Sequence, residues 1–126
     1  MEYRYDGERD LNIRLLTGKE VHAWVSEGMN QLAWRELASV CPWSTPFLNQ
    51  GFVRNWYTHY EDSWTPLLCI GTDKEGRLVG LAPLAVNSDL ITGAGSSQAE
   101  YQGWLSRAQD GEAFLGRMLY ALADRY

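Results

Sequence analysis

The sequence predicts one α+β (mixed α/β) domain in which a largely antiparallel sheet is flanked by helices. Three observations lead to this prediction. Apolar and polar residues alternate over 11–16, apolar residues recur at helical spacing over 21–40 and 46–60, and two apolar runs at 65–72 and 77–86 enclose a polar turn. The expected order of elements is strand, helix, helix, strand, strand, strand, helix, which favours a meander of strands with helices packed against it.

The first strand and the first helix are joined by a short capping sequence. Residues 17–20, Thr-Gly-Lys-Glu, have the form of a capping box, in which the Thr17 hydroxyl accepts from the Glu20 amide and the Glu20 carboxylate reaches back. A helix is therefore expected to start here. Gly28 can break or bend this helix, and Asn30 can cap its second half.

A second helical segment is expected after Pro42, which ends the first. Thr45 followed by Pro46 supplies an N-cap and a proline at the first helical position, so the helix is expected over 46–60. One face of this helix carries large side chains four residues apart, namely Leu48, Phe52, Trp56 and Tyr60.

A hairpin over residues 65–86 is the strongest strand signal. We expect a strand at 65–72, a turn at 73–76 in which Gly76 adopts positive φ, and a return strand at 77–86. Both faces of the return strand are apolar, so layers are expected on both sides of the sheet. One face would carry Leu78, Gly80, Ala82, Leu84 and Val86, and the other Val79, Leu81, Pro83 and Ala85.

Pro83 lies inside this apolar run, although a proline cannot donate a hydrogen bond to a neighbouring strand. In a strand buried on both faces, a proline is expected at a bulge or where neighbouring strands part. The alternative is a proline at a strand end or on an edge strand, with no functional role.

The last third of the chain is predicted as a short strand, a loop and a helix. The strand is expected near 89–92, and a loop rich in Gly, Ser and Gln follows over 93–109. The helix is expected over 110–126, with Asp110 or Ser106 as its cap.

The domain is expected to span residues 11–126, after a polar leader at 1–10. A chain of 126 residues that is 45% hydrophobic can form one globular domain with its own core. No capping glycine and no strand follow the last helix, so the domain is expected to be incomplete at its C-terminal end.

Charge and cysteine content exclude several classes of function. The chain has 11 basic and 16 acidic residues, a formal net charge of −5 with neutral histidines, and its basic residues are scattered. Nucleic acids and membranes are therefore not expected partners. Cys41 and Cys69 lie in apolar settings without metal-ligand spacing, which predicts buried free thiols in a reducing cytoplasm. His22 and His59 have no ligand partner at helical spacing, so no metal is expected.

Four short segments, taken in order, carry a resemblance to a known family. They are Trp34-Arg35-Glu36-Leu37-Ala38; Pro46-Phe47-Leu48 with Val53-Arg54-Asn55-Trp56; Gly76 to Leu84, GRLVGLAPL; and Gly93-Ala94-Gly95 with Glu100-Tyr101. Their order and spacing over residues 11–123 resemble the N-terminal half of GNAT-superfamily proteins related to the CelD-like cellulose-biosynthesis acetyltransferases. The chain differs from the family in having Glu100 where the family has Asp, and its glycines before the last helix lack the R/Q-x-x-G-x-G/A spacing of the acyl-CoA loop.

The resemblance implies a GNAT-like sheet and acetyl-CoA as the donor substrate. In GNAT folds the sheet splays to admit the pantetheine arm of acetyl-CoA, so the resemblance implies that Pro83 marks a departure from regular pairing. In larger relatives a second GNAT-like half carries the acyl-CoA loop. The resemblance therefore implies the N-terminal part of an acyltransferase that is inactive on its own, with an amine or hydroxyl of a small molecule or saccharide as acceptor.

The resemblance also directs attention to Glu100 and Tyr101. Glu100 is expected to deprotonate the acceptor for direct attack on the thioester, and Tyr101 to donate a proton to the leaving thiolate. Independently of the resemblance, a sugar-stacking platform has five candidate residues: Trp34, Trp43, Trp56, Trp64 and Trp104. Trp104 is the expected substrate-binding residue, because it is the tryptophan most expected to be exposed. The structural alternative is a solvated loop carboxylate beside a packed tyrosine, with tryptophans that only fill the core.

The competing functional hypothesis is a non-catalytic, degenerate GNAT-like module. Such a module would bind a ligand or a partner, or would form a homodimer that covers an unfinished sheet edge.

Overall fold

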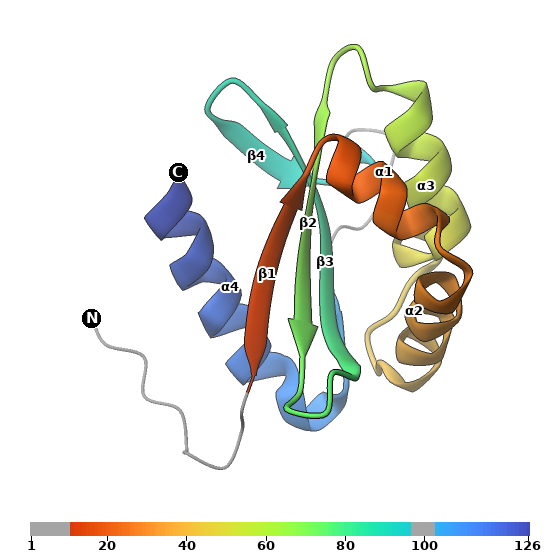
Figure 1. The fold of residues 1–126 in the computed structure, drawn as a ribbon, viewed down its shortest axis with the longest axis vertical. Coiled ribbons are helices and arrows are strands. Elements are labelled where there is room, and N and C mark those ends of the chain that lie inside the picture. The colour runs from red at the N-terminus through yellow and green to blue at the C-terminus, as the bar shows by residue number, and fades with distance from the viewer. Residues whose placement is uncertain (1–10, 97–102) are drawn as a thin grey trace.

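The computed structural model describes residues 11–96 and 103–126; the leader expected at 1–10 lies outside these ranges. Within them the chain forms a five-stranded antiparallel sheet with α-helices on both faces (Figure 1). The predicted α+β class is confirmed. The strands are β1 (Asn12–Thr17), β2 (Thr65–Thr72), β3 (Leu78–Asn87), β4 (Leu90–Gly93) and β5 (Leu105–Ser106), and the helices are α1 (Lys19–Ser26), α2 (Gly28–Val40), α3 (Gln50–His59) and α4 (Gly111–Arg125).

Two apolar layers enclose the sheet, as the two apolar faces of the return strand predicted. Helices α1, α2 and α3 cover one face, and α4 covers the other (Figure 1). The first layer includes the buried Trp34, Trp56, Tyr57, Leu68, Leu81 and Leu105, and the second includes Leu11, Cys69, Val79, Ala82, Phe114 and Met118.

The capping box between β1 and α1 forms only in part. The Glu20 carboxylate accepts from the Thr17 N–H at 3.3 Å, as predicted. The Thr17 hydroxyl does not cap the helix, because Thr17 pairs with Leu67 in the β1–β2 ladder and Gly18 takes the N-cap position. Gly18 adopts φ of +57°, a left-handed conformation that favours glycine.

The predicted break near Gly28 is confirmed, but its predicted cap is wrong. Helix α1 ends at Ser26, and the Glu27 carboxylate caps α2 by accepting from the Met29 N–H at 3.1 Å. Asn30 instead donates from Nδ2 to the Trp24 carbonyl at 3.1 Å, which satisfies one of the last carbonyls of α1.

The single helix predicted over 46–60 is two elements. Pro46–Leu48 is a 3-10 turn, and α3 starts only at Gln50. The cause is Asn49, whose backbone is extended and whose side chain accepts from the Gly51 N–H at 2.7 Å. An asparagine side chain competes for backbone N–H groups in this way and favours a cap over a helix interior.

The hairpin of β2 and β3 has the predicted strands and turn. Gly76 adopts φ of +81° at the turn, as expected. Near it the register shifts, because Gly71 pairs with Gly80 while the adjacent Thr72 pairs with Leu78. The bulge leaves Val79 as an extra residue, so Leu78 packs in the α1–α3 layer and Val79 in the α4 layer. The faces predicted for these two residues are therefore wrong.

Pro83 lies where the two neighbours on one side of β3 part. Strand β4 pairs with β3 from Asn87 to Leu84, and β5 pairs with Leu81 and Gly80. The Pro83 carbonyl accepts from the Ala94 N–H at 2.8 Å, so it points to this side of β3. The nitrogen of the same residue points to the same side, and because it carries no hydrogen it gives no return bond to the Ala94 carbonyl. The predicted departure from regular pairing is confirmed.

Strand β5 was expected to be part of a loop. It has two residues, Leu105 and Ser106, and it follows a segment rich in Gly, Ser and Gln. Its pairing with Gly80 and Leu81 joins segments far apart in the chain, and short-range sequence patterns carry no information about such contacts.

Helix α4 packs closely on the sheet through Phe114. The opposed glycines Gly71 and Gly80 lie under its ring. A Cβ added at Gly71 would lie 2.7 Å from Phe114 Cδ1, and one added at Gly80 would overlap the ring. The two opposed glycines therefore leave the space on the sheet that the Phe114 ring fills.

Of the two predicted caps of the last helix, Asp110 holds the N-cap position but makes no side-chain cap hydrogen bond, and Ser106 is not the cap. Helix α4 starts at Gly111 with no side-chain cap from Asp110, whose carboxylate accepts from Arg107 Nε. The Ser106 hydroxyl donates to the Arg107 carbonyl at 3.0 Å. No helix in the described ranges combines the length and apolar character needed to cross a bilayer.

Candidate functional site

The structure does not place two of the predicted site residues. Glu100 and Tyr101 lie outside the described residues. Of the three predicted site residues, only Trp104 lies within the described ranges, directly before β5.

Trp104 packs against Trp43, with ring centroids 5.4 Å apart and an angle of 55° between the planes. Trp43 Nε1 also donates to the Trp104 carbonyl at 2.8 Å. Trp104 is half-buried and contacts the α4 layer, whereas Trp43 is 37% exposed. The expectation that Trp104 is the most exposed tryptophan is wrong, because the ring of Trp43 covers it.

The pair lies at the start of α4. A Cβ on Gly111 would be 2.8 Å from Trp43 Cη2, so the Trp43 ring rests on the first residue of the helix. Trp104 Nε1 is buried and has no hydrogen-bond acceptor within residues 11–96 and 103–126. The first turn of α4 is therefore covered by an aromatic ring.

The remaining candidates are explained by packing. Trp34 and Trp56 are 1% and 4% exposed and lie in the core, as the structural alternative expected. His59 is exposed and contacts the edge of Tyr60 at 4.9 Å between ring centroids. Cys41 and Cys69 are buried and free, as predicted, and burial raises the pKa of Cys69 to about 12, so it is a thiol at neutral pH.

A cleft of about 510 Å³ lies between α2, the β2–β3 hairpin and the segment before α4. Its volume is in the range of ligand pockets. Arg14 of β1, Arg77 before β3 and Arg107 after β5 all line it, together with Glu36 of α2 and Asn30. The fold thus gathers three guanidinium groups that are scattered in the sequence.

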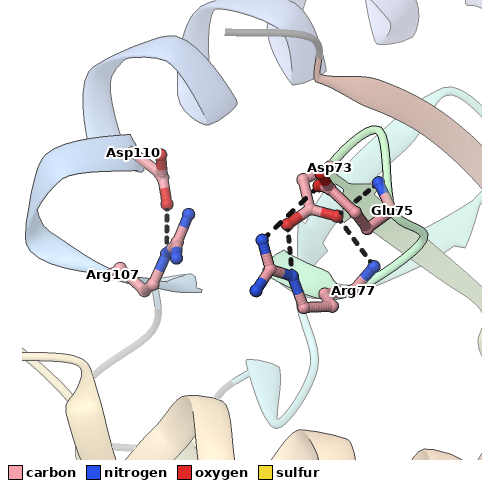
Figure 2. Close-up of polar contacts among 5 residues, drawn as sticks. All are labelled: Asp73, Glu75, Arg77, Arg107 and Asp110. Atoms are coloured by element: carbon pink, nitrogen blue, oxygen red, sulfur yellow. Dashed lines mark hydrogen bonds and ion pairs between the residues drawn. The ribbon is translucent and has the colours of Figure 1, made fainter.

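Arg77 is anchored by the hairpin turn. Its Nε donates to Asp73 Oδ2 at 2.8 Å, and its Nη2 lies 3.4 Å from Glu75 Oε2 (Figure 2). Asp73 Oδ1 also accepts from the backbone N–H groups of Glu75 and Arg77 at 3.0 and 2.9 Å. Partial burial alone would raise the pKa of Asp73, but the hydrogen bonds and charge of Arg77 hold it below the usual value.

Arg107 is anchored in the same way by a different segment. Its Nε donates to Asp110 Oδ2 at 2.6 Å, and the Asp110 side chain is 7% exposed (Figure 2). Figure 2 shows the Arg77 and Arg107 side chains extending toward each other, each with its carboxylate beside it. Neither Asp73 nor Asp110 lines the cleft.

Asp73→Asn is expected to destabilise the protein at neutral pH by about 0.5–1 kcal/mol, because Arg77 is largely exposed and solvent screens the ion pair. The folded-state pKa of Asp73 is lowered, so its stabilisation is present above the unfolded-state pKa of about 4 and disappears as pH falls through the folded-state value. Urea unfolding at pH 7 and at pH 2.5 measures this difference.

The exposed Asp62→Asn is the matched control and is expected to change stability little at either pH. A difference between wild type and Asp73→Asn that is as large at pH 2.5 as at pH 7 would contradict the role of the charge.

The sequence contained no signal for this cleft. Arg14, Arg77 and Arg107 belong to no motif and lie in three separate segments. The only local hint was the Asp-Lys-Glu-Gly-Arg turn, in which Asp73 can hold Arg77.

Comparison of the chain with protein-family models, with curated proteins and with solved structures finds no match. Function is therefore inferred from the residues and from the geometry of the described ranges.

Proposed function

We propose that this chain is the N-terminal part of a GNAT-like acyltransferase related to the CelD-like enzymes. The donor is acetyl-CoA or another acyl-CoA, and the acceptor is an amine or hydroxyl on a small molecule or a saccharide. The two free buried cysteines support placing this activity in a reducing compartment such as the cytoplasm.

The observation that supports this proposal most is the break in strand pairing at Pro83. On the side of β3 away from β2, the pairing with β4 ends at Leu84 and the pairing with β5 begins at Leu81. A departure from regular pairing at Pro83 is what the GNAT resemblance implies for this segment. The proline leaves this end of the β3–β4 ladder one backbone donor short.

The start of α4 does not fit the pyrophosphate of an acyl-CoA. The Trp43 ring rests on Gly111, and Asp110 directly before the helix is acidic. A pyrophosphate needs open backbone N–H groups and no neighbouring negative charge. The acyl-CoA loop is therefore expected in a second half of the protein, and the 126 residues alone are expected to be inactive.

Glu100 is the proposed base that deprotonates the acceptor, which then attacks the thioester carbonyl directly. The proton that the leaving thiolate needs comes from Tyr101. Trp104 is not assigned to the acceptor, because the Trp43 ring covers it. No covalent intermediate on the protein is required.

The test uses the protein encoded by the whole reading frame. With acetyl-CoA and a panel of amines and saccharides, release of the CoA thiol is expected for the full protein and not for residues 1–126. Glu100→Gln in the full protein is expected to lower kcat by about 10²-fold or more. The exposed Glu61→Gln is the control and is expected to retain full activity.

Two outcomes would contradict the proposal. One is a stop codon directly after Tyr126, and the other is a full protein that binds no acyl-CoA in calorimetric titration.

A non-catalytic binding module is the second candidate, and the arginine-lined cleft favours it. The cleft is formed by described residues of this chain and needs no second half. Under this hypothesis residues 1–126 bind a ligand, or form a homodimer through a sheet edge, without acyl transfer. Light scattering coupled to size exclusion measures the dimer.

A further inference from the structure

We propose that the cleft between α2, the β2–β3 hairpin and the segment before α4 binds a small organic anion, a carboxylate or a phosphate monoester with an apolar body. This site goes beyond the proposed acyl transfer and does not depend on it.

The polar side of the cleft is suited to an oxyanion. Arg14, Arg77 and Arg107 come from three elements and line one cavity. A guanidinium presents several N–H donors in a planar fork that matches carboxylate and phosphate oxygens. Two of the three are ion-paired with carboxylates outside the lining, so what the cleft offers an anion is a set of N–H donors rather than an excess of positive charge.

Two of the guanidinium groups are held in position and still have donors left. Arg107 uses Nε for Asp110, and Arg77 uses Nε and Nη2 for Asp73 and Glu75. The Nη groups of Arg107 and Nη1 of Arg77 have no protein acceptor in the described part of the chain. Their carboxylates lie outside the cleft lining, so they orient the arginines without filling the cavity.

Arg14 adds a third donor group whose side chain makes no hydrogen bond or ion pair in the described part of the chain. It is exposed on β1 and forms no ion pair within residues 11–96 and 103–126. Arg14 can therefore bind a ligand without breaking a hydrogen bond within the protein. Its substitution tests ligand binding with the least effect on the fold.

The other wall of the cleft is apolar. It is formed by Trp24, Leu37, Val40 and Leu78, of which Val40 is 57% exposed. A bare inorganic ion would leave this surface in contact with water, whereas a ligand with an aromatic or aliphatic body would cover it. The cleft therefore favours an organic anion over an inorganic one.

Glu36 is the one carboxylate in the described lining of the cleft. It opposes a bound anion, so removing its charge is expected to strengthen binding, whereas removing Arg14 is expected to weaken it. Two opposite effects at one site are not produced by a general change in stability.

The experiment titrates phenyl phosphate and benzoate into ¹⁵N-labelled protein and follows amide shifts. Both anions are expected to bind with a Kd of about 1 mM or tighter, with shifts around Arg77 and Arg107 and weaker binding at high salt. Arg14→Gln is expected to raise Kd about five-fold and Glu36→Gln to lower it by a similar factor. Arg35→Gln, an exposed α2 arginine outside the lining, is the control and is expected to have no effect.

Arg107→Gln is informative only beside Arg14→Gln, because it also removes a partner of the buried Asp110. The proposal is overturned if Arg14→Gln leaves Kd unchanged, or if neutral benzyl alcohol binds as tightly as benzoate. It is also overturned if inorganic phosphate binds as tightly as phenyl phosphate, since the site would then take a bare ion.

The outcome is separate from that of the proposed function. Anion binding that Arg14→Gln weakens, in a full protein that shows no acyl transfer, supports the cleft and removes the acyltransferase. If the full protein transfers acyl groups and Arg14→Gln leaves its Kd for phenyl phosphate unchanged, the result supports the acyltransferase and removes the anion site.

Discussion

Gly80→Ala is expected to destabilise the protein by about 3 kcal/mol, because overpacking of a filled core costs about 1–3 kcal/mol and occasionally more. The added Cβ would be 2.5 Å from Phe114 Cγ and nearer still to Cδ1. The Phe114 ring is fully buried between α4 and the sheet, so it cannot retreat without moving the helix. The free energy of unfolding in urea measures the change.

Gly28→Ala is the control for the Gly80 substitution. Gly28 is the first residue of α2, and a Cβ there would meet nothing within 4 Å. This substitution is expected to leave stability unchanged or to raise it by about 0.5 kcal/mol, since alanine loses less backbone entropy than glycine.

A double substitution separates the steric effect from an effect of alanine on the strand. Phe114→Leu removes the ring, so Gly80→Ala is expected to cost less in that background than in the wild type. An equal cost in both backgrounds would show that Phe114 is not the reason for glycine at position 80.

Trp34→Ala is expected to destabilise the protein by about 3–5 kcal/mol, which is the usual cost of truncating a buried large aromatic residue. Trp34 is 1% exposed, and its ring lies between α1 and the core, 6.3 Å from Trp24 by centroids. Its Nε1 also donates to the Leu48 carbonyl at 2.9 Å, so it ties α2 to the turn before α3.

Trp34→Phe keeps most of the apolar volume and removes that hydrogen bond. It is expected to cost less than the alanine, about 1–3 kcal/mol, because the buried Leu48 carbonyl loses its donor. Tyr120→Ala on the exposed face of α4 serves as control and is expected to stay within about 0.5 kcal/mol of wild type. A Trp34→Ala protein as stable as Tyr120→Ala would be inconsistent with a core position.

Tyr57 shows how the core can hold a polar group without giving it a chemical role. It is 1% exposed, and its hydroxyl donates to the Leu84 carbonyl at 2.7 Å. Burial raises the pKa of this phenol, which the hydrogen bond to Leu84 offsets only in part. Tyr57 is therefore neutral throughout the physiological range and is a structural donor beside the strand break.

The sequence predicted only those parts of the candidate site that depend on neighbouring residues in the chain. The hairpin turn was predictable, because Asp73 and Gly76 have turn-specific side chains and backbone freedom. The cleft was not, because Arg14, Arg77 and Arg107 are brought together by the order of strands in the sheet. No periodicity within a segment encodes that order.

Local patterns in the sequence determined the elements and the layers. Alternation predicted β1, helical spacing predicted α2 and α4, and the apolar hairpin predicted a sheet covered on both sides. These features follow from short-range periodicity, which repeats every two residues in a strand and every 3.6 in a helix.

Tertiary structure decided the details that depend on contacts between distant residues. The small strand β5 and the covering of Trp104 by Trp43 each require a partner far away in the chain. The bulge at Val79 lies within a hairpin, but no alternation of residue types marks it. Pro83 joins the two levels. Its ring removes a backbone donor by covalent chemistry alone, but the tertiary structure decides where this loss falls, between the segment of β3 that pairs with β4 and the segment that pairs with β5.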